Sequence, residues 1–108
     1  MIYEHRIYHV IPGKMPAILN RLQNTTVGLF ERYGIRPIGF WTTFIGESSL
    51  DLTYIIAWQS LAEREQKWAK FASDPELQAE IAETERDGAI VGSVSVQFLK
   101  PTAFSPLP

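Results

Sequence analysis

The sequence predicts an α+β protein whose elements follow the order β-α-β-β-α-β. Residues 2–10 form a strand-like segment that ends at a Pro-Gly turn, and residues 90–99 alternate apolar and polar side chains with a period of two. Residues 35–46 and 51–58 are rich in β-branched and aromatic types and flank a short polar turn. The two long segments between these strands have helical spacing of their apolar residues.

The first strand, IYEHRIYHV, carries different chemistry on its two faces. Because side chains alternate along a strand, Glu4, Arg6 and Tyr8 share one face, whereas His5 and His9 lie on the other. Polar groups on both sides of one strand indicate either a lined cavity or an interface.

A helix is expected between Met15 and Tyr33. One buried helix face is predicted by the spacing of Met15, Ile18, Leu19, Leu22, Leu29, Phe30 and Tyr33. Pro16 suits the first turn, where its missing N–H is not needed, and Gly34 suits the position after the last turn. Residues 25–28 (TTVG) are poor helix formers, so we expect a local irregularity there.

The next two strands are expected at residues 35–46 and 51–58, and a loop of about four residues between them predicts an antiparallel hairpin. In the first of these strands, Trp41 and Thr43 fall on one face. Threonines interleaved with aromatic residues suit a lined pocket as well as a core, and both interpretations stay open.

Two N-cap motifs predict where helices begin in the second helical region. Ser60 and Glu63 form a capping box, and the helix that follows is expected to turn Leu61, Trp68, Phe71 and Ala72 toward the core. Asp74 and Pro75 then begin a second segment. That segment runs to Asp87, and its six acidic residues, Asp74, Glu76, Glu80, Glu83, Glu85 and Asp87, predict a solvated face.

The element order is that of a ferredoxin-like fold with an antiparallel sheet, in which both helices cover one face and the first and third strands are central. The third strand, DLTYIIAW, is apolar on both sides. Two helices bury only one side, so we expect a second copy of the sheet to cover the other in a homodimer. The chain is expected to form one domain over residues 1–108, with a Pro-rich tail at 101–108.

Composition excludes several classes of function. The net charge is −2 and no basic cluster exists, so no nucleic-acid partner is expected. The chain has no cysteine and no apolar stretch near the roughly 20 residues of a membrane span. Strand-like sequence begins at residue 2, which leaves no signal peptide and favours a cytoplasmic protein. No phosphate loop, metalloprotease motif or nucleophile elbow is present, and no cofactor is expected.

The two histidines do not predict a metal site. Four residues of strand rise separate His5 from His9 by roughly 13 Å, too far for two ligands of one ion. Either histidine facing a cavity remains a candidate general base.

Glu4, Arg6 and Tyr8 follow one another at intervals of roughly 7 Å along one strand face, so their side chains can meet. One interpretation is an ion pair of Glu4 with Arg6 that sets how two sheets register across an interface. The other is a polar patch in a ligand cleft, where Arg6 holds an anionic or carbonyl group and Tyr8 donates a hydrogen bond.

Five short motifs occur in order along the chain: IYEHRIY (2–8), GFWTTFIGE (39–47), WQSLAERE (58–65), FASDPE (71–76) and PTAFSPL (101–107). Together they resemble the NIPSNAP family. The resemblance implies a dimeric α+β barrel, in which two ferredoxin-like units face one another through their sheets. It implies no established catalytic residue.

Two functions are therefore considered. The first is a small dimeric module that binds a small molecule or serves a structural role, with Glu4, Arg6, Tyr8, Trp41 and Thr43 as candidate ligand-binding residues. The second is a cofactor-independent monooxygenase-like enzyme acting on an aromatic or polyketide-like substrate in a cavity between sheet and helices. There His5 or His9 would accept a proton, Arg6 or Tyr8 would stabilise the anion, and Trp41 would pack on the ring. A haem-handling variant would use one histidine as axial ligand.

Overall fold

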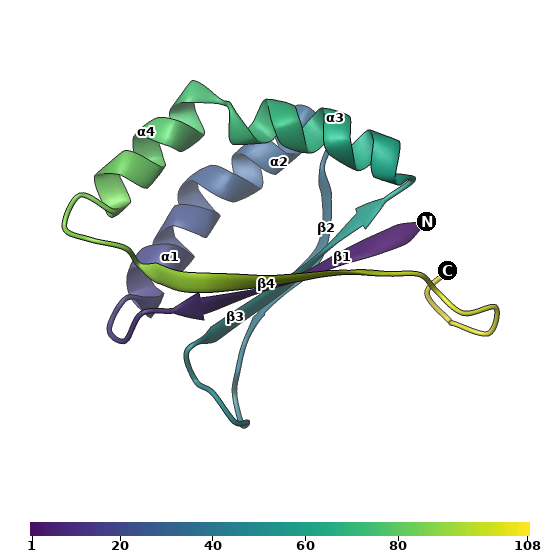
Figure 1. The fold of residues 1–108 in the computed structure, drawn as a ribbon, viewed down its shortest axis with the longest axis horizontal. Coiled ribbons are helices and arrows are strands. Elements are labelled where there is room, and N and C mark those ends of the chain that lie inside the picture. Colours follow the sequence, from purple (N-terminus) through teal and green to yellow (C-terminus); the bar gives the residue numbers. More distant parts are fainter.

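The computed structural model describes residues 1–108 and consists of a four-stranded antiparallel sheet with helices on one face (Figure 1). The chain runs through β1 (Ile2–Val10), α1 (Met15–Arg21), the π-helical turn η1 (Leu22–Thr26), α2 (Val27–Tyr33), β2 (Arg36–Thr42), β3 (Asp51–Trp58), α3 (Leu61–Ala72), α4 (Pro75–Thr84) and β4 (Val91–Leu99). The strand order β2-β3-β1-β4 places β1 and β3 in the centre. The predicted ferredoxin-like topology is confirmed.

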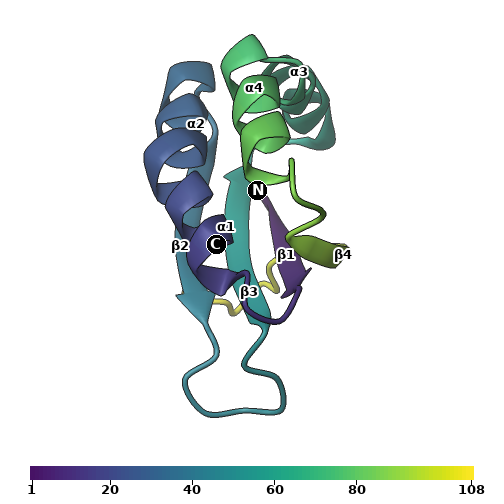
Figure 2. The same cartoon turned by 90° about the vertical axis from the view of Figure 1, so that its left-hand side faces the viewer.

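The view in Figure 2 shows the two layers, with both helical segments side by side over the sheet. No helix combines the length and the apolar character that a bilayer crossing requires.

The strand register defines two faces of the sheet. Arg6 of β1 lies opposite Tyr54 of β3 and Val96 of β4, and directly opposed residues point to the same side. We call this side, toward the helices, the helix-covered face. The other side, which includes His5 and Ile55, is the open face.

The long helix forms as expected, and its irregularity takes the form of the π-helical turn η1. The turn lies slightly before residues 25–28 and includes both threonines, Thr25 and Thr26, which are buried. Gly34 ends the helix with φ of +70°, a left-handed conformation that favours glycine. One member of the predicted apolar stripe, Leu19, is 39% exposed, because it lies at the margin of the face that packs on the sheet.

Both predicted N-caps of the second helical region are confirmed. The Ser60 hydroxyl accepts the Glu63 N–H at 3.1 Å, and the Asp74 carboxylate accepts the N–H groups of Glu76 and Leu77 at 2.8 and 3.3 Å. Glu63 does not complete the capping box, because its carboxylate turns to Lys67 instead.

Two predicted positions in this region are wrong. Leu61 is exposed because it occupies the first turn of α3, at the end of the helix. Asp74 is buried and does not belong to the solvated acidic face, because Arg32 and Tyr33 of the first helical segment both bond its carboxylate.

The predicted end of the second strand is also wrong. Pairing of β2 with β3 stops where Thr42 meets Leu52, since β3 itself begins at Asp51. The connection therefore spans residues 43–50 instead of about four residues, and Phe44 at its tip is 94% exposed. Figure 2 shows this connection extending away from the body of the sheet.

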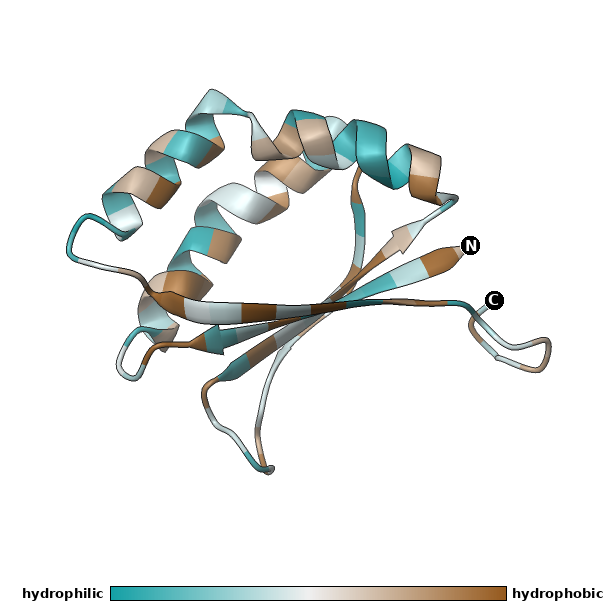
Figure 3. Cartoon of the chain, viewed as in Figure 1, coloured by the Kyte–Doolittle hydropathy of each residue, from teal (hydrophilic) through white to brown (hydrophobic).

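The core lies between the sheet and the helices. Trp58, Ile56 and Tyr54 of β3 pack against Leu29 and Phe30 of α2. A second group joins the start of the first helix to the other end of the sheet, and consists of Val10, Ile18, Leu22, Leu52 and Ile90. In Figure 3, hydrophobic and hydrophilic residues alternate along α3, α4 and β4, as expected for elements with one apolar side.

We predict that Ile18→Ala lowers the free energy of unfolding by about 2–5 kcal/mol, because Ile18 is 0% exposed and its removal leaves a cavity. Its neighbour Leu19 is 39% exposed and provides a matched control, for which Leu19→Ala should cost about 1 kcal/mol or less. Urea unfolding followed by circular dichroism measures both, and equal losses would contradict this assignment of the buried helix face.

Candidate functional site

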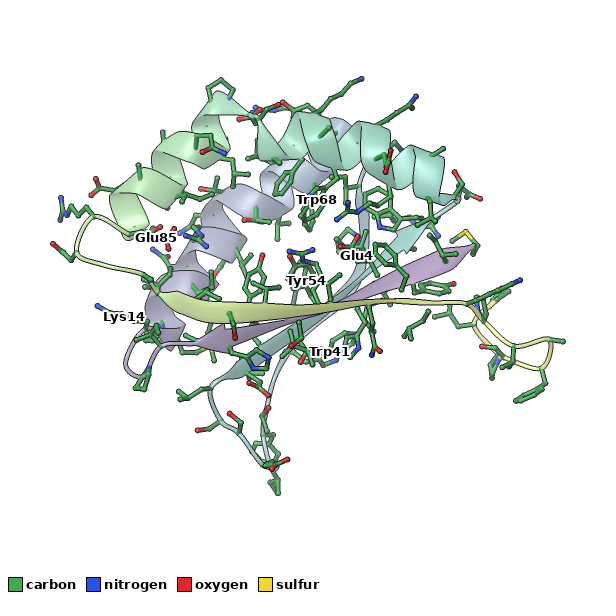
Figure 4. All side chains as sticks on the ribbon, in the orientation of Figure 1. Glu4, Lys14, Trp41, Tyr54, Trp68 and Glu85 are labelled. Atoms are coloured by element: carbon green, nitrogen blue, oxygen red, sulfur yellow. The ribbon has the colours of Figure 1, made fainter.

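A buried carboxylate lies at the centre of the helix-covered face. Glu4 of β1 is fully buried and accepts a hydrogen bond from the Trp58 indole N–H at 2.9 Å. It also accepts from Nη1 of Arg6 at 2.7 Å, and from Nε and Nη2 of Arg64 at 3.1 and 3.2 Å. Arg64 lies on α3, so this carboxylate connects two strands to the helix above them (Figure 4).

The hydrogen bonds keep this carboxylate ionised. Burial acts to raise the pKa of Glu4, but the hydrogen bonds from Arg64, Arg6 and Trp58 outweigh it, and the pKa is lowered. Two guanidinium groups thus face one carboxylate, and the cluster carries one more positive than negative charge.

Arg6 is held among aromatic rings. Its guanidinium carbon lies 4.7 Å from the centre of the Trp68 ring, and 5.8 and 5.9 Å from those of Tyr54 and Tyr8. These distances are within the range of cation–π attraction. The Nε of Arg6 is buried and has no hydrogen-bond partner, which is uncommon for a charged donor.

Two tyrosines continue the polar cluster along the sheet. The hydroxyls of Tyr8 and Tyr54 are 2.8 Å apart, and their rings meet edge to face. Burial, followed by the nearby Tyr8, raises the pKa of Tyr54 well above its usual value. The Tyr54 phenol is therefore neutral, and its hydroxyl is paired with that of Tyr8.

A cavity of about 210 Å³ lies beside this cluster, between sheet and helices. Tyr8 forms its floor, Leu22 and Thr26 come from η1, and Trp68 and Phe71 come from α3. The lining is mainly apolar. The cavity therefore joins a hydrophobic surface to the edge of a positively charged cluster.

The structure brings together three of the predicted site residues, Glu4, Arg6 and Tyr8. They lie beneath α3, and Arg64 of that helix shares the Glu4 carboxylate. The interpretation of the Glu4–Arg6 pair as a contact between two sheets is therefore wrong, because such a contact needs the open face. The alternative, a polar patch next to a ligand cleft, stays a prediction, since Tyr8 lines the neighbouring cavity but Glu4 and Arg6 do not.

The other predicted residues lie elsewhere. His5 and His9 are on the open face, where Nδ1 of His5 is 2.9 Å from Nε2 of Gln97, and neither lines the cavity. The chain contains no group of three or more His, Cys, Asp or Glu residues able to hold a metal ion.

Trp41 and Thr43 do not line this cavity either. Trp41 is 49% exposed on the open face, on the opposite side of the sheet from Glu4, Tyr54 and Trp68 in Figure 4, so of the two interpretations left open for it, the core is wrong. Its ring lies so close to Gly39 that a Cβ at that position would be 2.8 Å from it. Thr43 falls in the connection after β2, outside the strand.

Sequence reasoning missed Tyr54, Arg64 and Trp68 as parts of the site. Periodicity predicts Tyr54 and Trp68 only as apolar core, because it cannot show which aromatic ring meets a guanidinium. The sequence does hold one indication of this site. Tyr54 places a phenol among aliphatic residues in LTYIIAW, and a buried hydroxyl needs a hydrogen-bond partner.

The family model described as NIPSNAP matches residues 3–106. The chain belongs to the NIPSNAP family. The comparison with curated proteins finds no match.

Solved structures of NIPSNAP proteins share this fold over their whole length. A NIPSNAP family protein from Agrobacterium tumefaciens is 30% identical, with a TM-score of 0.86 and coverage of 99% of this chain and 98% of that one. An uncharacterized NIPSNAP domain protein from Burkholderia xenovorans is 27% identical, with a TM-score of 0.83 and coverage of 98% and 99%.

More distant structures show the fold alone. An antibiotic biosynthesis monooxygenase is 9% identical, with a TM-score of 0.62 over 94% of this chain and 99% of that one. A mutant of MhuD, solved with two manganese protoporphyrin IX molecules per active site, is 13% identical, with a TM-score of 0.60 over 97% and 98%. The predicted α+β class therefore extends beyond the NIPSNAP family.

We predict that Glu4→Gln lowers the free energy of unfolding by about 3–5 kcal/mol at neutral pH, because it leaves two guanidinium groups without their buried carboxylate. The pKa of Glu4 is lowered on folding, so its stabilisation is present above the unfolded value of 4.5 and is lost as pH falls through the folded pKa. The difference between wild type and variant should therefore shrink below pH 4.5.

Urea unfolding at several pH values measures this difference. Glu63→Gln is the control, since Glu63 makes only a peripheral pair with Lys67 at 3.4 Å and should change stability little. A difference between wild type and Glu4→Gln that stays constant from pH 7 to pH 3 would contradict the ionised, hydrogen-bonded state of Glu4.

Proposed function

We propose that this NIPSNAP protein is a homodimer that binds a small, mainly apolar molecule with one anionic group in the cavity between sheet and helices. The observation that carries the proposal is the buried, unpartnered Nε of Arg6, which lies among the rings of Tyr8 and Trp68 that line the cavity. Arg6 is not itself among the residues that line the cavity, so it would attract an anionic group there by its charge, from behind these two rings.

Charge supports an anion over a neutral ligand. Glu4 neutralises only one of the two guanidinium groups, and the remaining positive charge is partly shielded from water by Trp68. The Tyr54 phenol adds a neutral donor bonded to Tyr8. A carboxylate, enolate or phenolate fits this combination of one cation and hydroxyl donors.

Size and lining limit the ligand further. The volume of about 210 Å³ is below the roughly 300–1,000 Å³ typical of pockets for drug-sized ligands. Aromatic and aliphatic walls from Trp68, Phe71 and Leu77 favour a flat apolar body. A single-ring aromatic acid is therefore the class of ligand that we test.

The open face supports the homodimer. Ile38, Trp41 and Ile55 place apolar surface on the β2–β3 half of this face, with Trp41 half-exposed. Exposed apolar surface of this kind favours association with a second copy about a twofold axis.

A monooxygenase-like activity is the second candidate, favoured by the fold likeness to the antibiotic biosynthesis monooxygenase. The proposed proton acceptors His5 and His9 lie on the opposite face of the sheet from the cavity. Glu4 is occupied by three donor residues, and the residues that line the cavity include one charged group, Arg21, and no free base. This geometry favours binding over catalysis.

We predict that benzoate binds the purified protein more tightly than benzamide, its neutral analogue, and that Arg6→Gln weakens benzoate binding about tenfold or more, as expected for a lost hydrogen bond to a charged group. Tyr8→Phe should weaken it less. Isothermal titration calorimetry measures the affinities, and Arg86→Gln, on the exposed surface, is the control.

A further variant, Ala72→Leu, fills the cavity without altering the charged cluster, and it should abolish binding. Equal affinity for benzoate and benzamide, or unchanged benzoate binding in Ala72→Leu, would overturn the proposed site.

We predict that wild-type protein sediments at micromolar concentration as a species of twice 12.3 kDa, and that Trp41→Glu shifts it toward 12.3 kDa, because the substitution places a charge on the apolar half of the open face. Phe44→Glu is the matched control, since Phe44 lies in the exposed β2–β3 connection. A wild type that sediments only at 12.3 kDa would refute the dimer.

A further inference from the structure

Arg21, the last residue of α1, is the one charged residue that lines the cavity between sheet and helices. Its side chain is only 11% exposed, which is uncommon for an arginine. The guanidinium stays charged in a protein and carries N–H groups in a rigid planar fork, so a buried arginine needs acceptors around it. A full positive charge is therefore enclosed at the edge of a mainly apolar space.

One nitrogen of this guanidinium already has partners on α4. Nη1 of Arg21 donates to Oγ1 of Thr84 at 3.0 Å and is 3.5 Å from Oε2 of Glu85. The Thr84 hydroxyl donates its own proton to the carbonyl oxygen of Glu80 at 2.8 Å, so it accepts from Arg21. These contacts fix the position of the guanidinium from its Nη1 side.

The other side of the guanidinium is unused. Nε and Nη2 of Arg21 donate to no protein atom. Glu85 forms an ion pair with Arg21 but no hydrogen bond, and its own side chain is 31% exposed. The fork of neighbouring N–H groups on a guanidinium matches the oxygens of a carboxylate. Arg21 thus combines a fixed position with free donors of the geometry that a carboxylate requires.

We propose, on the basis of the ligand cavity proposed above, that Arg21 binds the carboxylate of the ligand directly. The ligand is therefore a carboxylic acid, and Arg21 is the residue that selects it over a neutral molecule of the same shape. Its apolar body lies against the walls formed by Trp68, Phe71 and Leu77. Arg6 acts on the same carboxylate only through its charge, from behind the rings.

The uncharged polar side chains of the lining do not compete for this role. They include Tyr8, Thr26 and Gln78. The Tyr8 hydroxyl is paired with that of a second tyrosine, and Nε2 of Gln78 donates to the carbonyl oxygen of Ala72 at 2.6 Å. A charge-assisted hydrogen bond is roughly twice as strong as a neutral one, so a carboxylate in this cavity binds best at Arg21.

The site does not depend on the open face of the sheet. The cavity lies on the helix-covered face, and Arg21, Thr84 and Glu85 belong to α1 and the end of α4. A second copy that covers the open face in the proposed homodimer therefore leaves the cavity and Arg21 uncovered.

Isothermal titration calorimetry with benzoate and benzamide measures the preference for the charged ligand as the ratio of the two dissociation constants. We expect Arg21→Gln to lower this preference about tenfold or more, as expected for the loss of a hydrogen bond to a charged group, with little change in benzamide binding. Arg21→Lys should retain part of the preference, since it keeps the charge but loses the fork.

A control separates binding from a purely structural role, because Arg21 also ties α1 to α4. Thr84→Val removes the same tie but keeps the guanidinium, and it should keep the preference for benzoate. NMR provides an independent readout: benzoate should shift the Nε–H resonance of Arg21, which is assigned by its loss in Arg21→Gln, and benzamide should not.

The outcomes distinguish this role from the function on which it rests. A preference for benzoate that survives in Arg21→Gln but is lost in Arg6→Gln would overturn the role of Arg21 and leave the proposed cavity intact. A preference lost to the same extent in Thr84→Val would assign Arg21 a structural role only. Equal binding of benzoate and benzamide by the wild type would refute both proposals.

Discussion

The buried carboxylate of Glu4 is the interaction on which the arrangement of this protein depends. It accepts hydrogen bonds from β1, β3 and α3 through Arg6, Trp58 and Arg64. A charge in such a place is stable only when its partners are complete, so the carboxylate fixes where α3 lies over the sheet. The position of α3 in turn sets Trp68 over Arg6 and determines one wall of the cavity.

The polar groups on the two faces of the central strand β1 lie in different environments. On the helix-covered face, the charged groups are dehydrated, paired and surrounded by aromatic rings, which suits electrostatic recognition of an anion. On the open face, His9, Asp51 and Ser95 are partly exposed, and their hydrogen bonds lie across the strands. Opposite sides of one strand thus carry a dehydrated charged cluster and a partly exposed hydrogen-bonded one.

Strand β4, at the edge of the sheet, is covered by the helices less completely than the central strands. The apolar side of β4, formed by Val94, Val96 and Phe98, is nearly half exposed although it points toward the helices. The helical layer therefore does not reach fully across the sheet, and the helix-covered face remains accessible from the β4 side.

Local sequence patterns were enough to predict the order of elements, the caps at Ser60 and Asp74, an irregularity near residues 25–28 and the resemblance to the NIPSNAP family. These features depend on local backbone chemistry and on motifs that residues close in the chain specify. The alternation along β1 also placed Glu4, Arg6 and Tyr8 on one face correctly.

Which face of the sheet the helices cover is known only from the tertiary structure, because period-two alternation separates two faces without saying what packs on either. Contacts between distant segments, such as Arg64 with Glu4 and His9 with Asp51 and Ser95, come from strand register and helix position, which no local pattern encodes.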